Sequence, residues 1–123
     1  MGRVVDESGA ASVVALGLVG AIVALAALLA PVLGVFVATQ RVANAADAAA
    51  LAAADATSGA VPGVPCDLAA DVAARNGATL VGCEIDGPVA SVSVRSTPFG
   101  YAIEARARAG PPGWEVLSRT PSR

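Results

Sequence analysis

Two cysteines are the most informative reactive side chains in this sequence. Cys66 and Cys83 are present, whereas histidine and lysine are absent. A serine–histidine, cysteine–histidine or serine–lysine nucleophile therefore cannot be built from these residues. Two cysteines seventeen positions apart, with no CxxC spacing and no histidine, also make a poor zinc site. We expect no enzymatic activity, no metal and no cofactor.

The charged residues give no better indication of catalysis. The acidic pairs Asp6/Glu7 and Glu84/Asp86 are most simply solvated charges. The formal net charge is −2, so the chain offers no basic field for nucleic acid. Neither a P-loop nor a dinucleotide-binding glycine pattern occurs in the sequence. We expect neither a nucleic acid nor a small-molecule substrate as partner.

The cysteine pair favours a disulfide. Both residues follow a long apolar stretch, and an even number of cysteines in a small domain is typical of an oxidising compartment. Closing a loop of this length stabilises a domain by about 3 kcal/mol in the chain-entropy model. All eight cations are arginine, which suggests a GC-rich bacterial genome.

The apolar stretch, Ser8–Gln40, holds thirty-three residues without a formal charge. As a helix it would be about 50 Å long, more than the ~30 Å hydrocarbon core of a bilayer. One arginine flanks each end, Arg3 and Arg41, so the positive-inside rule gives no orientation. The cysteines place the C-terminal part outside. We expect a single-pass protein of the cytoplasmic membrane with an extracytoplasmic domain.

A secretory signal peptide is the alternative for the same segment. Ala24-Leu25-Ala26 resembles a cleavage site, and cleavage there would release a soluble binding module that starts near Ala27. Against it, the apolar run is far longer than a signal peptide requires, and the residues before it are more acidic than basic.

Small residues recur four positions apart within the apolar stretch, a spacing that lets helices approach closely in lipid. An alanine- and glycine-rich sequence also produces such pairs by chance. The pairs are Gly17 with Ala21 and Gly20 with Ala24. Pro31 removes one backbone hydrogen bond and predicts a kink near Ala27–Pro31.

The helix should continue beyond the apolar stretch, from about Ala10 to Thr57, because alanine and leucine favour it throughout. One face of its second part is polar: Gln40, Arg41, Asn44, Asp47 and Asp55. The opposite face is flat and suited to packing under a sheet or against a second helix: Val42, Ala45, Ala46, Ala49 and Ala53. Leu51 falls on the polar face, either as a partner contact beside Asn44 and Asp47 or as an ordinary exposed leucine.

A small domain should follow the helix. AVPGVP, at residues 60–65, is typical of a linker. Asp67 is predicted to be the N-cap of a helix over 68–76, and Asn76-Gly77 is predicted to end that helix. Alternation then predicts three antiparallel strands, at about 79–85, 89–95 and 101–108, with Arg95 opposite Glu104. The expected inward residues are Val81, Cys83, Ile85, Ala90, Val92, Val94, Tyr101, Ile103, Ala105 and Ala107.

The predicted fold is therefore α+β: a long helix, a short helix and a three-stranded sheet that the helices must cover. The tail after residue 109 lacks periodicity and contains Trp114, which belongs to a docking peptide or to a solvated tail. The predicted divisions are a flank over 1–9, the helix over 10–58, a linker over 59–66, the small domain over 67–109 and a tail over 110–123.

Two segments resemble a known family. ESGAAS at Glu7–Ser12 and QRVANAADAAALAAA at Gln40–Ala54, on either side of the apolar helix, resemble the TadE/TadG-like proteins of tight-adherence (Flp) pilus assembly and secretion systems. The segment from Cys66 through NGA at Asn76–Ala78 to Cys83, and then ARAGP at Ala107–Pro111, is similar to small actinobacterial TadE-like proteins.

The resemblance implies a pilin-like fold and a minor pilin or pseudopilin. Such a protein would be anchored in the cytoplasmic membrane and would pack against other pilin-like subunits or Tad-type assembly proteins. It also implies cleavage by a prepilin peptidase after Gly2, which would make Glu7 the fifth residue of the mature chain.

Overall fold

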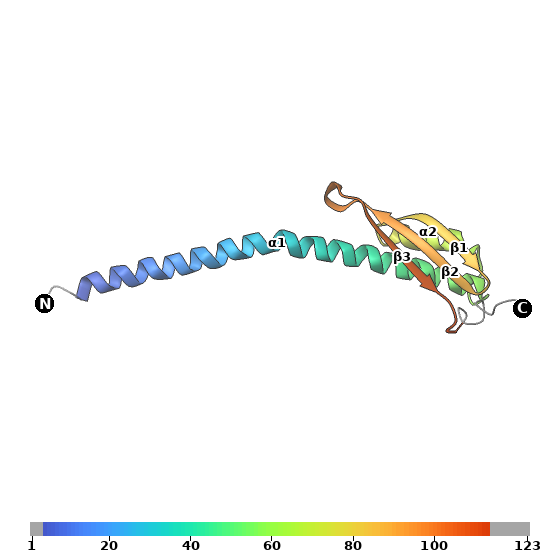
Figure 1. Ribbon diagram of the computed structural model, residues 1–123, viewed down its shortest axis with the longest axis horizontal. Helices are drawn as coiled ribbons and strands as arrows, with labels where there is room; N and C mark the ends of the chain where they lie inside the picture. The colour runs from blue at the N-terminus through green and yellow to red at the C-terminus, as the bar shows by residue number, and fades with distance from the viewer. Residues whose placement is uncertain (1–3, 114–123) are drawn as a thin grey trace, which may run out of the picture. The chain divides into compact units, whose positions relative to one another are not determined.

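A computed structural model describes the backbone of residues 4–113 and the side chains of residues 9–113. The predicted cleavage after Gly2 and the predicted role of Trp114 lie outside the described residues. The chain divides into two units, Met1–Val37 and Ala38–Arg123, which are considered separately below. Figure 1 shows the elements in chain order, from α1 through α2, β1 and β2 to β3.

Helix α1, Val4–Thr57, contributes to both units. It begins six residues earlier than the predicted Ala10 and ends at the predicted residue. The end has a local cause: Gly59 has a φ of 79°, which a glycine adopts without steric cost, and the Thr57 hydroxyl donates to the carbonyl of Ala53 at 2.8 Å. Pro31 lies inside the helix without ending it.

The second unit contains an antiparallel sheet of three strands in the order β1-β2-β3, as predicted. The strands are β1 Thr79–Asp86, β2 Val89–Ser96 and β3 Ile103–Ala109. Gly87 and Pro88 alone join β1 to β2, and Gly87 has a φ of 55°, as tight hairpin turns require at their first position. Alternation along β2 is confirmed, because Ala90, Val92 and Val94 are all buried.

The prediction for β1 was wrong at Val81. Pairing with β2 shifts between Leu80 and Gly82, so Val81 is the extra residue of a bulge. The shift turns Leu80 and Cys83 toward the core and leaves Val81 45% exposed. Ile85, at the end of the strand, is 40% exposed. A single inserted residue thus reverses the facing of the residues before it.

The prediction for β3 was wrong at Tyr101. The strand begins only at Ile103, and Tyr101 is 77% exposed. A short 3-10 turn, η1, occupies Pro98–Gly100 between the strands. The predicted pairing across this hairpin is confirmed: Arg95 lies opposite Glu104, and its guanidinium donates to the carboxylate at 3.2 Å.

Helix α2, Pro65–Arg75, starts earlier than predicted and takes in the end of the predicted linker. Asp67 is not its N-cap. Val64 holds that position without a side-chain hydrogen bond, because the helix starts at Pro65, a residue whose fixed φ suits a first turn. Asp67 therefore lies in the first turn. The predicted end is confirmed, since Asn76 caps the helix and Gly77 has a φ of 76°.

The core lies between one face of the sheet and the two helices, α1 and α2 (Figure 1). It is built mainly from alanine, and among the described residues Val94 is the largest side chain that is fully buried. Cys83 and Leu80 of β1 and four alternate residues of β3 pack against its edge. The buried cluster consists of Val42, Ala45, Ala46, Ala49, Ala50, Ala53, Ala69, Ala73, Ala78, Ala90, Val92 and Val94.

The close approach of α2 to this core gives a stability prediction. Ala73 has no exposed surface, whereas its neighbour Ala74 in the same helix is exposed. Ala73→Leu should lower the free energy of unfolding by about 1–3 kcal/mol, because added methylenes do not fit a packed core. Ala74→Leu should change it by less than about 0.5 kcal/mol. Thermal unfolding of both variants in detergent, followed by circular dichroism, checks this; equal melting temperatures would contradict the proposed packing.

Candidate assembly surfaces

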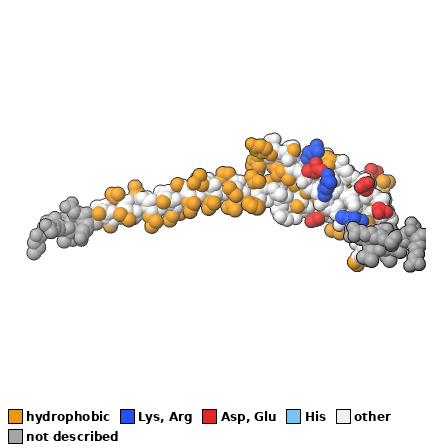
Figure 2. Space-filling view, in the orientation of Figure 1, with side chains coloured by type: hydrophobic (Ala, Val, Ile, Leu, Met, Phe, Trp, Pro, Cys, Tyr) orange, Lys and Arg blue, Asp and Glu red, His pale blue; other side chains and the backbone are white. Residues whose placement is uncertain are grey.

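The first unit presents an apolar surface on all sides of α1. Large apolar side chains such as Leu16, Leu28 and Phe36 are 79%, 73% and 71% exposed, and Figure 2 shows apolar atoms along the length of this segment. By length and composition, α1 could cross a membrane once. A surface that is apolar all round is unfavourable in water, and lipid or other helices would bury it.

The small residues of this unit form the first candidate contact. Gly17, Gly20, Ala21 and Ala24 are exposed, and we call them the small-residue seam. A Cβ atom added at Gly17 or Gly20 would meet nothing within 4 Å in this chain. The glycines therefore have no packing role inside the chain, and a larger side chain there would be felt only by a neighbouring molecule.

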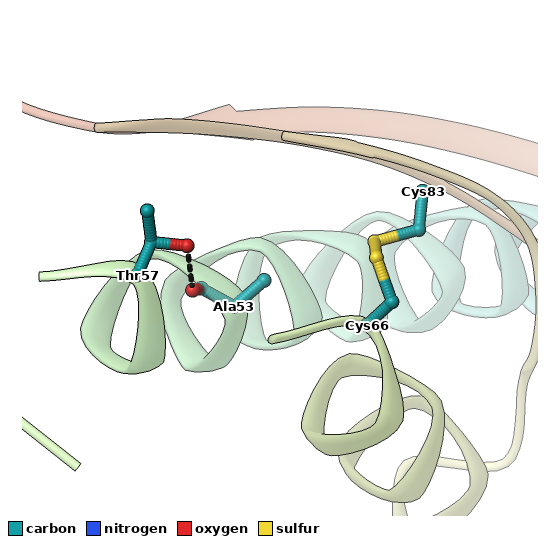
Figure 3. The surroundings of a disulfide bond; sticks show 4 residues. All are labelled: Ala53, Thr57, Cys66 and Cys83. Atoms are coloured by element: carbon teal, nitrogen blue, oxygen red, sulfur yellow. Dashed lines mark hydrogen bonds between the residues drawn. A yellow bond between two sulfur atoms is a disulfide. The ribbon is translucent and has the colours of Figure 1, made fainter. Parts of the chain in front are cut away.

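The disulfide links α2 to β1 in the second unit. Cys66, the second residue of α2, is bonded to Cys83 in the middle of β1, with their Cα atoms 5.9 Å apart. The bond therefore joins the covering helix to an edge strand. Ala53 and Thr57 of the last turns of α1 lie in its surroundings (Figure 3), and Cys83 also packs against the core.

The two faces predicted for the second part of α1 differ in exposure: one is buried in the domain and the other is accessible. Ala45, Ala46, Ala49 and Ala53 have no exposed surface and are covered within the domain, in one cluster with residues of both the sheet and the second helix, α2. A partner protein cannot reach these alanines while the domain is folded.

The predicted contact residues on the other face of α1 are accessible. Leu51 is 58% exposed and Asn44 accepts a hydrogen bond from the Gln40 amide at 3.3 Å. Asp47 and Leu51 line a shallow depression of about 470 Å³ with Arg108 and Gly110 at the end of β3. The structure thus joins the helix face to the end of an edge strand, which the sequence pattern could not indicate.

The outer face of the sheet is charged. Glu104 accepts from Arg95 at 3.2 Å and lies 3.6 Å from the Arg106 guanidinium. All three side chains are at least one-third exposed, so this network contributes little to stability. Figure 2 shows acidic and basic side chains on the surface of the second unit.

The hairpin between β2 and β3 carries a feature that the sequence reasoning missed. Phe99 and Tyr101 are 76% and 77% exposed at its tip. Phe99 has a φ of 56°, in the left-handed region that bulky residues rarely adopt. The available signal was an uncharged run, Ser96–Ile103, in which two aromatic residues flank a glycine.

The described residues offer little for chemistry. Among residues 9–113, no three histidine, cysteine or acidic side chains gather as metal ligands, and no polar or charged residue is buried. Comparison with protein families, with curated proteins and with solved structures finds no match for this chain. The accessible surfaces are therefore the features of the described residues that remain available for a function.

The disulfide gives a second prediction. Reduction should lower the free energy of unfolding by about 3 kcal/mol, because the unfolded chain regains the freedom of the loop between the cysteines. Thermal unfolding with and without reductant measures the difference. The matched control is the Cys66→Ser/Cys83→Ser variant, whose melting temperature should be low and indifferent to reductant. Labelling of both thiols in the unreduced, exported protein would show that the bond is absent.

Proposed function

We propose that this chain is a membrane-anchored, pilin-like component of a Tad/Flp-type pilus assembly or secretion system. The observation that carries the proposal is the course of α1. One uninterrupted helix supplies an apolar segment long enough to span a bilayer and then one side of the core of a small α+β domain. A simple membrane tether would need neither the part of α1 after Val37 nor the burial of that part in a domain.

The resemblance of NAADAAALAAA to TadE/TadG-like sequences supports the same proposal. The run alternates exposed positions with buried alanines of the cluster that also contains residues of the sheet and of α2. Its composition is thus explained by a helix that must pack closely within a small domain. This packing accounts for the part of the resemblance that is most specific in sequence.

The proposed location is the cytoplasmic membrane, with the domain on the outside. The disulfide supports this orientation, because such bonds persist in oxidising compartments and are rare in the cytosol. The domain then holds the accessible face with Asn44, Asp47 and Leu51 toward other components outside the membrane.

In this proposal the partners are other pilin-like subunits or Tad-type assembly proteins. The small-residue seam supports a lateral contact within the membrane, since small side chains let helix backbones approach and gain van der Waals contact. Deletion of the protein should abolish pili or secretion without loss of a catalytic activity. An apparatus that works normally in the deletion strain would contradict the proposal.

The seam provides a sharper test in the complemented strain. Gly17→Leu/Gly20→Leu should leave protein level and membrane insertion unchanged, since a Cβ there meets nothing within 4 Å. It should nevertheless reduce assembly or secretion, because leucines would hold a neighbouring helix away. Ala15→Leu/Ala26→Leu is the matched control: both alanines are exposed, and at 100° per residue they lie on the face of the helix opposite the seam. Equal effects of the two variants on assembly or secretion would show that the small-residue seam is not a contact with another subunit.

The alternative function is a soluble binding module released by a signal peptidase. One observation favours it: every residue of the buried cluster comes from Val42 or later, so cleavage near Ala27 would leave the core intact. Mass spectrometry of the mature N-terminus in cell fractions decides between the two. A membrane-bound species that retains the apolar segment supports anchoring, and a soluble species that starts near Ala27 supports release.

A further inference from the structure

The exposed tip of the β2–β3 hairpin has no role in the domain core. Phe99 and Tyr101 are each more than three-quarters exposed, and neither belongs to the buried cluster or to the residues packed against it. The eight residues Ser96–Ile103 carry no charge, although Arg95 and Glu104 stand on either side of them. The tip is therefore a small apolar surface bounded by charges.

The backbone conformation at the tip also indicates a role outside the domain core. A φ of 56° places Phe99 where glycine or asparagine is expected, and a bulky side chain is disfavoured there. Folding does not require an aromatic residue at this position, since its side chain is 76% exposed. A costly backbone conformation that presents an aromatic side chain to the outside indicates a contact beyond the chain.

The tip lies at the end of the second unit where α1 enters it. The C-terminal end of β3 lies beside the middle of the second part of α1, because Arg108, Ala109 and Gly110 line one depression together with Asp47 and Leu51. From Arg108 back to Ile103 the strand covers about 17 Å. The strand crosses α1 at an angle in Figure 1, so this length corresponds to at most about 11 residues of helix, and it brings Ile103 toward the part of α1 that begins at Ala38. Figure 1 shows the hairpin reaching back along α1 to this end.

A hydrogen bond also places the hairpin tip at this end of the domain. The Ser96 hydroxyl donates to the carbonyl of Gly77, at 3.0 Å, so the tip lies beside the C-terminal end of α2. From there α2 runs back along β1, since Cys66 in its first turn is bonded to Cys83, and Val64 at its N-terminal end lies about 16 Å of helix away. The exposed aromatic residues are therefore found at the end where the chain passes from the apolar segment into the domain, which begins at Ala38.

We infer that Phe99 and Tyr101 form a second membrane contact, inserted into the headgroup region of the bilayer that α1 crosses. Aromatic side chains are enriched at this depth, where an apolar ring and a polar hydroxyl are both satisfied. Arg41, exposed one turn after Ala38, and Arg95 are placed to meet lipid phosphates. The contact would limit rotation of the domain about the membrane normal, and thereby orient Asn44, Asp47 and Leu51 for neighbouring subunits. The inference rests on the proposed membrane anchor.

The test uses the full-length chain reconstituted in phosphatidylcholine–phosphatidylglycerol vesicles. Trp114→Phe removes the sole tryptophan, and Phe99→Trp then supplies a single reporter. Lipids brominated near the headgroup end of their acyl chains quench tryptophan that they touch. Val64→Trp is the matched control, because Val64 is also an exposed apolar residue, 60% exposed, at the other end of the domain. Phe36→Trp reports on the span itself.

The inference expects quenching at position 99 to be several-fold greater than at position 64. Equal quenching at the two positions would overturn it while leaving the anchor intact, provided that position 36 is quenched. Absence of quenching at position 36 would overturn the anchor and the inference together. A blue-shifted emission at position 99 without bromine quenching would show that the tip contacts protein, which also overturns the inference.

A second variant separates lipid contact from folding. Phe99→Gly suits the positive φ, so the melting temperature of the domain in detergent should not fall. In vesicles, quenching of a Tyr101→Trp reporter should be several-fold weaker in the Phe99→Gly background than with Phe99 present, because the tip loses its larger apolar anchor. A lower melting temperature would show that Phe99 serves the fold instead.

Discussion

The domain depends on the close packing of alanines between the two helices, α1 and α2, and the sheet. Nine of the twelve residues in the buried cluster are alanine, and five of these come from α1. Such small side chains allow the helix to lie near the strands, but each removes little apolar surface from water. The hydrophobic contribution of this core is therefore modest for its number of residues. Any larger side chain at these positions would have to push the sheet away from the helix.

The other stabilising features follow from that limitation. A small sheet with a modest core cannot rely on burial alone, and the Cys66–Cys83 bond restricts the unfolded chain where burial is insufficient. The bond also joins the edge strand β1 to α2, the element that covers it. Since α1 is itself a layer of the core, the domain cannot fold without the helix that leads to the apolar segment. The helix that begins in the apolar segment thus continues into the domain core.

Continuity of the helix bears on an assembly. In the proposed assembly, contacts of the apolar segment and contacts of the domain are made by parts of one helix. A contact between the hairpin tip and lipid would add a third constraint on that helix. The accessible face around Leu51 would then be held in one orientation, which lowers the entropy lost when a neighbouring subunit binds.

Patterns with a strong local cause were predicted from the sequence. The end of α1 at Thr57, the hairpin that sets Arg95 opposite Glu104 and the end of α2 at Asn76 all depend on residues close together in the chain. The alternation of β2 was also correct, because a central strand has one covered face and its inward residues are determined by the period of two. Composition by itself indicated the span, the single small domain and the paired cysteines.

Tertiary structure decided the features that depend on what lies opposite a residue. The bulge at Val81 arises from pairing with β2 and reverses the facing that alternation predicts. That the flat alanine face met both the sheet and a second helix depended on segments sixteen or more residues away. The exposure of Phe99 and Tyr101 likewise depended on where β3 begins, since an aromatic residue in a strand is ordinarily counted as core. The sequence by itself determined the elements and their local ends, and only the packed structure decided which apolar residues remain on the surface.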